Sequence, residues 1–313
     1  MTQTLPDLFR ELSITDLFKT STMKNCWTVW KPEIHRFLGS NYSDSDILNL
    51  GDHLSEIFKS TGGTGRGQGE LSAGGTAWES LVCWYVNLCA VGSRIVAVKK
   101  MSLVPMPIRD AITVNYGNFA CNTESDITIL IFPDQPFYNQ DVNSIVVRDG
   151  AQVAVPLTAK GRLSSLAMDQ LFDRDFAQFE VGIIQCKTNW NDNAQVPMLW
   201  DMIYSAGGFS GRNITIGRNG FSIQACKNFT YSFVTVPSNQ RGGFTLTSTS
   251  VKRVTNLSGG NYWGCPTQQN VARSLKEIFN NNFQSGFKHS LREDIRSALP
   301  ELKSGQAYRY FGL

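Results

Sequence analysis

The spacing of apolar positions predicts helices in the first quarter of the chain. Residues 5–20 and 43–59 carry apolar side chains at helical intervals, and Ser43 or Asp44 stands where a helix cap belongs. Residues 60–69 are rich in glycine but lack the GxxxxGK[ST] sequence, which favours a flexible linker over a phosphate-binding loop.

A helix with apolar residues around most of its circumference is expected over residues 73–92. Thr76 and Glu79 have the spacing of a capping box at its start. Short apolar runs then predict strands. These runs are 95–98, 127–132, 144–147 and 179–186, followed by a helix over 197–206, three or four strands within 213–254, and helices over 269–279 and 289–299. This order predicts an α/β fold with a central mixed sheet flanked by helices and a β-rich C-terminal part.

The same pattern divides the chain into three segments. Residues 1–70 form a helical segment with a Gly-rich linker, residues 71–206 form a core, and residues 207–313 form a basic, aromatic-rich part. With 313 residues, the chain is long enough for one large domain with a buried core. We expect the last segment to pack on the core within a single domain.

Charge is distributed unevenly along the chain. The net charge is only +3, but residues 205–313 hold 13 basic and 4 acidic residues, and residues 205–276 hold no acid at all. A basic segment without acids is typical of a surface that binds a polyanion, and its many aromatic side chains could stack on bases. An antiparallel sheet with an aromatic core and solvated charges would have the same composition.

Cysteine and apolar content limit the class of protein. Seven cysteines without a CxxC pair argue against a disulfide framework or a structural zinc site. Apolar runs stay below the roughly 18 residues that a membrane helix needs, and the N-terminus lacks the layout of a signal peptide. We therefore expect a cytoplasmic protein that does not enter a membrane and that uses no haem, flavin or nicotinamide.

Three polar side chains are predicted to meet at the end of buried strands. Gln185 and Lys187 lie on one face of the strand over 179–186, because side chains alternate along a strand. Asp126 stands at the head of the strand over 127–132. A carboxylate oxygen, an amide oxygen and water are ligands that Mg²⁺ accepts, and a lysine beside them can hold a water or neutralise a phosphate oxygen.

These residues resemble the PD-(D/E)xK nuclease superfamily, the restriction-endonuclease-like fold, in its Mrr-like Q-x-K variant. The resemblance rests on GTAWESLV in the buried helix, ESDITIL at the start of a strand and VGIIQCK at the end of another, and it covers residues 71–206. It implies Asp126 as the principal metal ligand, Gln185 at the position of the second acid and Lys187 as the catalytic lysine. Glu79 would complete the metal site or position the water. Asp134 is an alternative to Asp126.

The implied activity is Mg²⁺-dependent cleavage of double-stranded DNA, with Mn²⁺ as a substitute metal, by a homodimer acting in restriction or anti-phage defence. Candidate DNA-contacting residues follow the lysine or lie in the basic segment. They are Trp190, Asn191, Gln195, Arg212, Arg218, Arg241, Lys252 and Arg253.

Other interpretations remain open. Glu79 could only cap its helix, Asp126 could be a turn residue, and Lys187 could be a solvated lysine at a strand end. A non-catalytic nucleic-acid-binding protein that keeps the nuclease fold is the main alternative. Cysteine, serine and zinc-dependent hydrolysis have little support, because the three histidines are scattered and GxSxG is missing.

Overall fold

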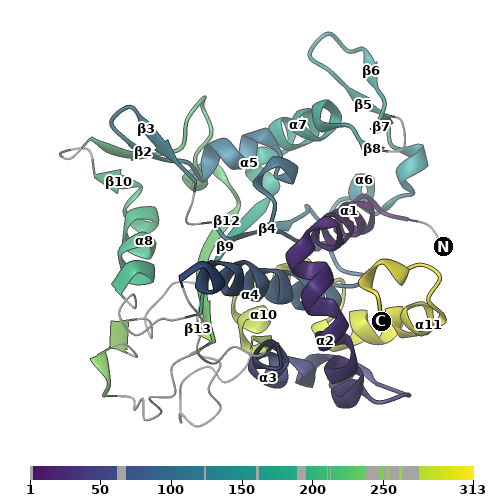
Figure 1. Cartoon of the computed structure of the whole chain (residues 1–313). Coiled ribbons are helices and arrows are strands. Elements are labelled where there is room, and N and C mark those ends of the chain that lie inside the picture. Colours follow the sequence, from purple (N-terminus) through teal and green to yellow (C-terminus); the bar gives the residue numbers. More distant parts are fainter. Residues whose placement is uncertain are drawn as a thin grey trace.

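A computed structural model gives the architecture of the chain (Figure 1). It describes residues 3–61, 68–122, 125–159, 162–188, 195–209, 211, 213–236, 247–249, 252–253, 261–262 and 275–313. The mixed α/β class expected from the sequence is confirmed by a central sheet with helices on both faces. None of the helices in this part of the chain combines the length and the apolar character that crossing a bilayer requires.

Three helices at the N-terminus begin at hydroxyl caps. They are α1 (Leu5–Lys19), α2 (Ser21–Leu38) and α3 (Asp44–Lys59). Thr20 ends α1 and caps α2 by accepting a hydrogen bond from the amide of Met23, and Ser43 forms a capping box with Asp46. The helices expected over 5–20 and 43–59 are thus confirmed, while α2 was not predicted, and its interior Pro32 obscures it in the sequence.

The buried helix is longer than expected. It is α4 (Gln68–Cys89), so Thr76 lies inside it and is not its cap. The predicted Thr76–Glu79 capping box is therefore wrong, because the helix already begins at Gln68 and Thr76 has helical residues on both sides. Asn87 joins α4 to the sheet, since its side-chain amide exchanges hydrogen bonds with the backbone of Ala97, at 2.8 and 3.0 Å.

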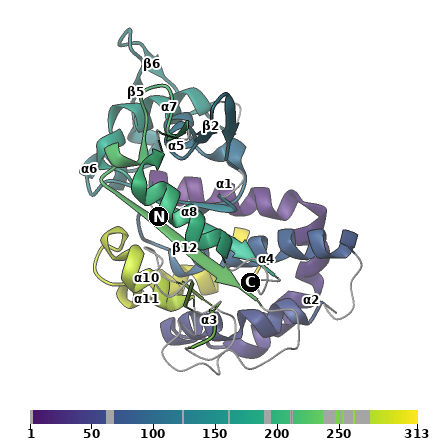
Figure 2. The same cartoon turned by 90° about the vertical axis from the view of Figure 1, so that its left-hand side faces the viewer.

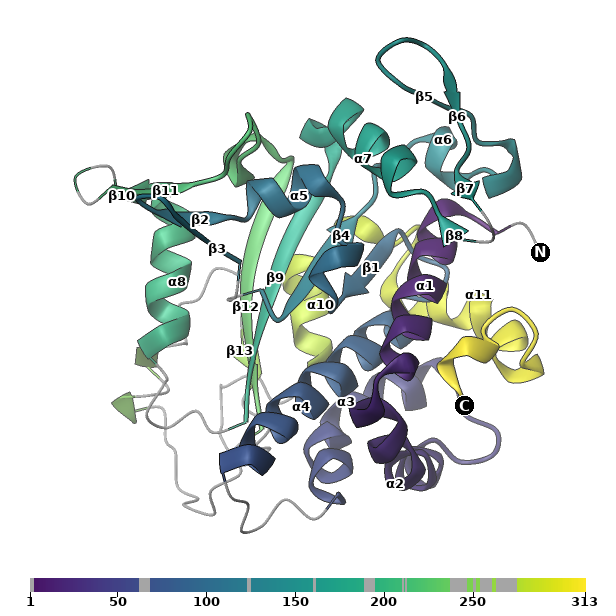
Figure 3. The same cartoon turned by 45° about the horizontal axis from the view of Figure 1, so that its top comes forward.

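The central sheet has the strand order β1-β4-β9-β12-β13 (Figure 3). The strands are β1 (Ile95–Val98), β4 (Ile127–Ile131), β9 (Glu180–Lys187), β12 (Asn228–Thr235) and β13 (Asn261–Tyr262). The first three pair antiparallel, whereas β12 lies parallel to β9 and β13 parallel to β12. The chain between β9 and β12 contains α8 (Gln195–Ala206), the helix expected over 197–206. Parallel neighbours need such a crossover connection.

Each face of the sheet is covered by its own hydrophobic core. On one face, Ile129, Ile184 and Val234 pack with α2, α3, α4, α10 (Lys276–Asn282) and α11 (Leu291–Ser304). On the other, Leu130 and Ile183 pack with α1, α5 (Met106–Ala111), α7 (Ser165–Arg174) and α8. Figure 2 shows these two helical layers with β12 between them.

The C-terminal end of the chain belongs to the first core. Trp84 of α4 donates from Nε1 to the carbonyl oxygen of Phe311, with a separation of 3.0 Å. Phe311 is fully buried and lies in a short 3-10 helix, Arg309–Phe311, that contacts α1. Residues from the beginning, middle and end of the chain therefore share one core.

Smaller sheets and one short helix extend from the central sheet. A second sheet has the order β10-β11-β2-β3, and two hairpins pair β5 with β6 and β7 with β8. Their bounds are β2 (Val114–Tyr116), β3 (Phe119–Cys121), β5 (Val147–Arg148), β6 (Ala154–Val155), β7 (Thr158–Ala159), β8 (Arg162–Leu163), β10 (Gly208–Phe209) and β11 (Ile214–Ile216), and the short helix is α6 (Pro136–Asn139). A strand over 144–147 was expected, but Asp141 caps a 3-10 turn over Val142–Ser144 and the strand begins only at Val147.

The C-terminal part is only partly as expected. It contributes β11 and β12 within 213–254, but helices α10 and α11 make up much of 275–313. The helix expected over 289–299 is confirmed by α11, and α10 overlaps the end of the one expected over 269–279. Residues 237–246 and 254–260 lie outside the described residues.

Candidate active site

The register of two antiparallel strands brings Asp126 to the end of β9 that carries Lys187. Ile127 pairs with Ile184 and Ile131 with Glu180, so Asp126, one residue before β4, lies beside the Gln185–Lys187 end of β9. Oδ2 of Asp126 accepts a hydrogen bond of 2.7 Å from the backbone N–H of Cys186. The carboxylate predicted to bind metal is thus hydrogen-bonded to the backbone of Cys186, the middle residue of the Q-x-K sequence.

The same register separates Asp134, the alternative to Asp126, and also Glu180 from this site. Asp134 follows the other end of β4, where its side chain is 75% exposed and lies 3.5 Å from Arg94. Glu180 begins β9 and forms an ion pair of 2.8 Å with Lys227. The geometry therefore favours Asp126 over Asp134.

Gln185 is held by a tyrosine that the sequence gave no reason to select. Its side chain is fully buried, and its Oε1 accepts a hydrogen bond of 2.6 Å from the hydroxyl of Tyr231 on β12. Tyr231 lies on the parallel strand next to β9, directly opposite Ile183. Side chains at these positions share one face of the sheet, so the hydroxyl fixes the direction of the amide.

Glu79 of α4 forms an ion pair with Lys99. The distance between Oε2 of Glu79 and Nζ of Lys99 is 3.0 Å, and both side chains are mostly shielded from water, at 22% and 20% exposure. Lys99 follows β1, the strand against which α4 packs. Lys99 was not predicted as a site residue. Its position directly after the strand expected over 95–98 is the one feature of the sequence that could have indicated it.

The pKa of the Cys186 thiol depends on burial and on nearby charges. Burial raises its pKa well above the usual value, Asp126 and Glu79 raise it further, and Lys187 opposes them. Cys186 is 5% exposed and lies in the core on the α4 side of the sheet. Because side chains alternate along β9, Cys186 faces α4, the helix that carries Glu79, whereas Gln185 lies on the other face of the sheet with Ile183. The raised pKa also keeps Cys186 protonated, which argues against a thiolate nucleophile.

A buried hydroxyl next to Lys187 lacks a hydrogen-bond partner. Thr235 pairs with Lys187 in the parallel register of β12 and β9, and its side chain is fully buried. Within the described part of the chain, its Oγ1 has no partner. A buried hydroxyl without a partner is unfavourable, so a hydrogen bond to the Thr235 hydroxyl would stabilise the protein. This hydroxyl lies beside the half-buried Lys187.

The donor atoms at this end of the sheet fit a water-rich Mg²⁺ site rather than a carboxylate cage. Asp126 offers carboxylate oxygens and Gln185 an amide oxygen, while Glu79 is engaged by Lys99. Among the residues described, no three His, Cys, Asp or Glu side chains form a group able to hold a metal ion. Mg²⁺ usually keeps several water ligands and needs only one or two protein carboxylates, so this donor set suits it.

Most of the candidate DNA-contacting residues are not placed. Trp190, Asn191, Arg212 and Arg241 lie outside the described residues, as does the side chain of Gln195 at the start of α8. Lys252 is exposed and Arg253 is half-buried. Arg218 donates to the buried carboxylate of Asp110 at 2.6 Å, and its side chain is still 46% exposed. Arg218, one of the eight candidates, therefore binds an acid of the protein and still has part of its side chain open to solvent.

Comparison with known proteins adds no relative. A scan against protein families found no family that matches the chain, and a search of curated proteins found no match.

Proposed function

We propose that this protein is a metal-dependent endonuclease of the PD-(D/E)xK type that hydrolyses DNA phosphodiester bonds. The observation that carries the proposal is the hydrogen bond of 2.7 Å between Asp126 and the backbone of Cys186, which joins the predicted metal ligand to the Q-x-K strand.

The order of elements also supports the proposal. A helix carrying Glu79 comes first, then a strand headed by Asp126, then the strand ending in Gln185 and Lys187, then a helix. Asp126 directly precedes β4, β9 carries Gln185 and Lys187, and these two strands are neighbours in one mixed sheet with helices on both faces. This is the order that the resemblance to restriction-endonuclease-like proteins requires.

Each candidate residue has a distinct role in the proposed reaction. Asp126 and Gln185 would hold the metal, and Lys187 would hold the attacking water and place its ammonium group against a phosphate oxygen. The water oxygen would bond to phosphorus as it gives up a proton, while the bond to the leaving sugar oxygen would break and that oxygen would take up a proton from solvent. When bound, Mg²⁺ supplies positive charge that stabilises the charge developing on the phosphate. Glu79, which is held by Lys99 at 3.0 Å, would complete the metal site or position the water.

The biological setting proposed is restriction or anti-phage defence in the cytoplasm. The substrate is double-stranded DNA, and a homodimer would provide two sites for the two strands. The basic residues of 205–276 would bind the phosphate backbone, as their composition favours. A non-catalytic DNA-binding protein with this fold would use the same basic residues but would have no need of Asp126 and Lys187 at one strand end.

The test is digestion of supercoiled plasmid and linear duplex DNA by the purified chain, with Mg²⁺, with Mn²⁺ and with EDTA. We expect metal-dependent cutting that Lys187→Ala and Asp126→Asn reduce by about a thousandfold or more, as for loss of a group that acts on the transition state. Lys100→Ala is the matched control, because Lys100 is 54% exposed and pairs with Asp16. DNA binding that weakens with salt, without cutting under any metal condition, would instead support the binding protein.

A further inference from the structure

A cavity separates the first turns of α1 from the C-terminal end of the chain, away from the candidate active site. Its volume is about 410 Å³, within the range of small-molecule sites. Its polar lining comes from both ends of the sequence. These residues are Gln3, Asp7, Glu301, Gln306, Tyr308 and Tyr310.

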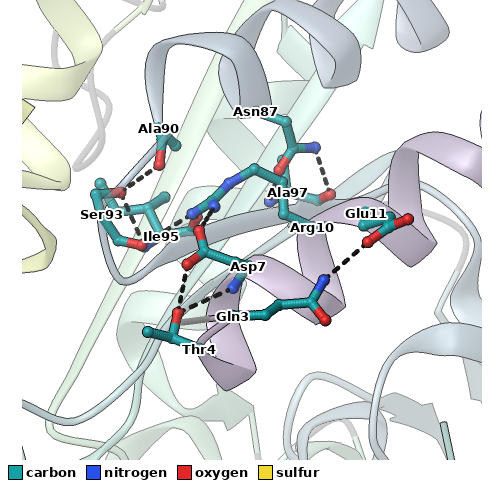
Figure 4. Close-up of polar contacts among 10 residues, drawn as sticks. All are labelled: Gln3, Thr4, Asp7, Arg10, Glu11, Asn87, Ala90, Ser93, Ile95 and Ala97. Carbon is teal, nitrogen blue, oxygen red and sulfur yellow. Dashed lines mark hydrogen bonds and ion pairs between the residues drawn. The ribbon is translucent and has the colours of Figure 1, made fainter. Parts of the chain in front are cut away.

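Asp7, which lines the cavity, forms an ion pair with Arg10 (Figure 4). Arg10 is fully buried and donates to the carbonyl oxygens of Ser93 and Ile95, at 2.9 and 2.8 Å. It also binds Asp7 at 2.6 Å, and the other oxygen of Asp7 accepts from the hydroxyl of Thr4. Asp7 is therefore neutralised within the protein.

Glu301, another residue of the cavity lining, carries a carboxylate for which the described residues provide no ion pair. Oε2 of Glu301 is shielded from water, and in the described residues it has no hydrogen-bond partner. Glu301 lies in the last turns of α11, where the basic residue of the last turn is Lys303, which binds Asn41 instead. A shielded carboxylate oxygen without a donor is unfavourable, so a donor from a ligand would stabilise it.

The aromatic residues of the cavity add a second unused group. The hydroxyl of Tyr310 is also shielded and unpartnered among the residues described, and Tyr308 is only 6% exposed. The two rings meet edge to face with their centroids 6.1 Å apart. Burial raises the pKa of both phenols above the usual value, so both stay neutral and present an electron-rich ring and a hydroxyl. Such rings attract a cation.

We propose that this cavity binds a small organic cation, a primary amine or guanidine with a compact carbon skeleton. The ammonium group would donate to Oε2 of Glu301 and the hydroxyl of Tyr310, and the carbon skeleton would lie against Tyr308. A phosphate or nucleotide does not fit this cavity, because Glu301 would repel it and Arg10 has its guanidinium bonded to Asp7 and two carbonyls. The proposal is independent of the nuclease activity.

The test is isothermal titration calorimetry of the full chain with putrescine and agmatine. Butanediol, which has the skeleton of putrescine without its charge, and inorganic phosphate serve as ligand controls. We expect one amine per chain and no heat from butanediol or phosphate. Glu301→Gln should weaken amine binding about tenfold or more, since a charge-assisted hydrogen bond is lost. Tyr310→Phe should weaken it less, by about threefold to tenfold.

The matched control is Asp173→Asn, which removes an exposed acid of α7 and should leave the affinity within about twofold. Thermal unfolding of each variant reports whether it is folded. The proposal is overturned by equal binding of butanediol and putrescine, by unchanged amine affinity in folded Glu301→Gln, or by no amine binding to the unmodified chain.

Discussion

The hydroxyl of Tyr231 donates a hydrogen bond of 2.6 Å to Oε1 of Gln185, inside the protein and between two parallel strands. Both side chains are fully buried. A buried amide is costly unless its oxygen and nitrogen are satisfied, so the tyrosine explains how a glutamine is accommodated at this depth. It also sets the direction in which the amide oxygen of Gln185 points.

Tyr231→Phe is expected to destabilise the protein by about 1–3 kcal/mol, because it leaves Oε1 of Gln185 without its donor while keeping the ring. Chemical denaturation of the variant measures this. A double-mutant cycle with Gln185→Leu isolates the pair. A coupling energy near zero would show that the hydrogen bond does not stabilise the fold.

Lys99→Met is expected to lower the Mg²⁺ concentration needed for half-maximal DNA cleavage. The substitution releases Glu79 from its ion pair of 3.0 Å and removes a positive charge near the candidate metal ligands, both of which favour a cation. We expect a shift of about twofold to fivefold, from Mg²⁺ titrations of the cleavage rate. Lys100→Met is the control. A higher Mg²⁺ requirement in Lys99→Met would contradict a role of Glu79 beside the metal.

Acid should weaken the contribution of Asp175 to stability. Burial alone would raise the pKa of Asp175, but hydrogen bonds from Arg174 and Tyr138 outweigh it and hold the pKa below its usual value. A carboxyl with a lowered pKa in the folded state stabilises the protein above its unfolded pKa of about 4 and loses this effect as the pH falls further. The free energies of unfolding of Asp175→Asn and of the unmodified protein should therefore differ most near neutral pH and become equal toward pH 3 or below. A difference that stays constant from neutral to acid pH would refute this.

Gly286→Ala is expected to destabilise the protein by about 1–3 kcal/mol through overpacking. A Cβ at this position would clash with the side chain of Ile95 and lie 3.0 Å from Cγ2 of Ile131, in the buried strands β1 and β4. The matched control is Gly150→Ala, where no heavy atom would lie within 4 Å of the new Cβ, and its effect should stay within about 0.5 kcal/mol. Equal stability of the two variants would mean that Gly286 can shift away from the sheet.

The sequence predicted the elements whose signal is local. The strands β1, β4 and β9 are apolar runs with every residue buried or nearly so, and α4 is apolar around its circumference. The alternation of side chains in β9 was enough to place Gln185 and Lys187 on one face. The choice of Asp126 over Asp134 needed the strand register, which brings Ile127 to Ile184 and which periodicity does not supply.

The residues that support the candidate site depend on long-range pairing and could not be found in this way. Tyr231 lies 46 residues from Gln185 and reaches it only because β12 pairs parallel to β9. Thr235 meets Lys187 through the same pairing. The Thr76 cap failed for a local reason, because α4 already begins at Gln68, inside the Gly-rich run over 60–69 whose composition favours a linker.

The hydrogen bond from Trp84 to Phe311 joins residues 227 positions apart, and this span has a consequence for synthesis. The ribosome completes α4 long before residue 311 emerges. Trp84 therefore lacks its hydrogen-bond partner Phe311 while most of the chain is made. Chain elongation at about 5–20 residues per second makes that interval about ten seconds or longer. A nascent chain of this protein therefore completes its core only once translation has passed Phe311, although Trp84 can pack against Trp27 of α2 before that.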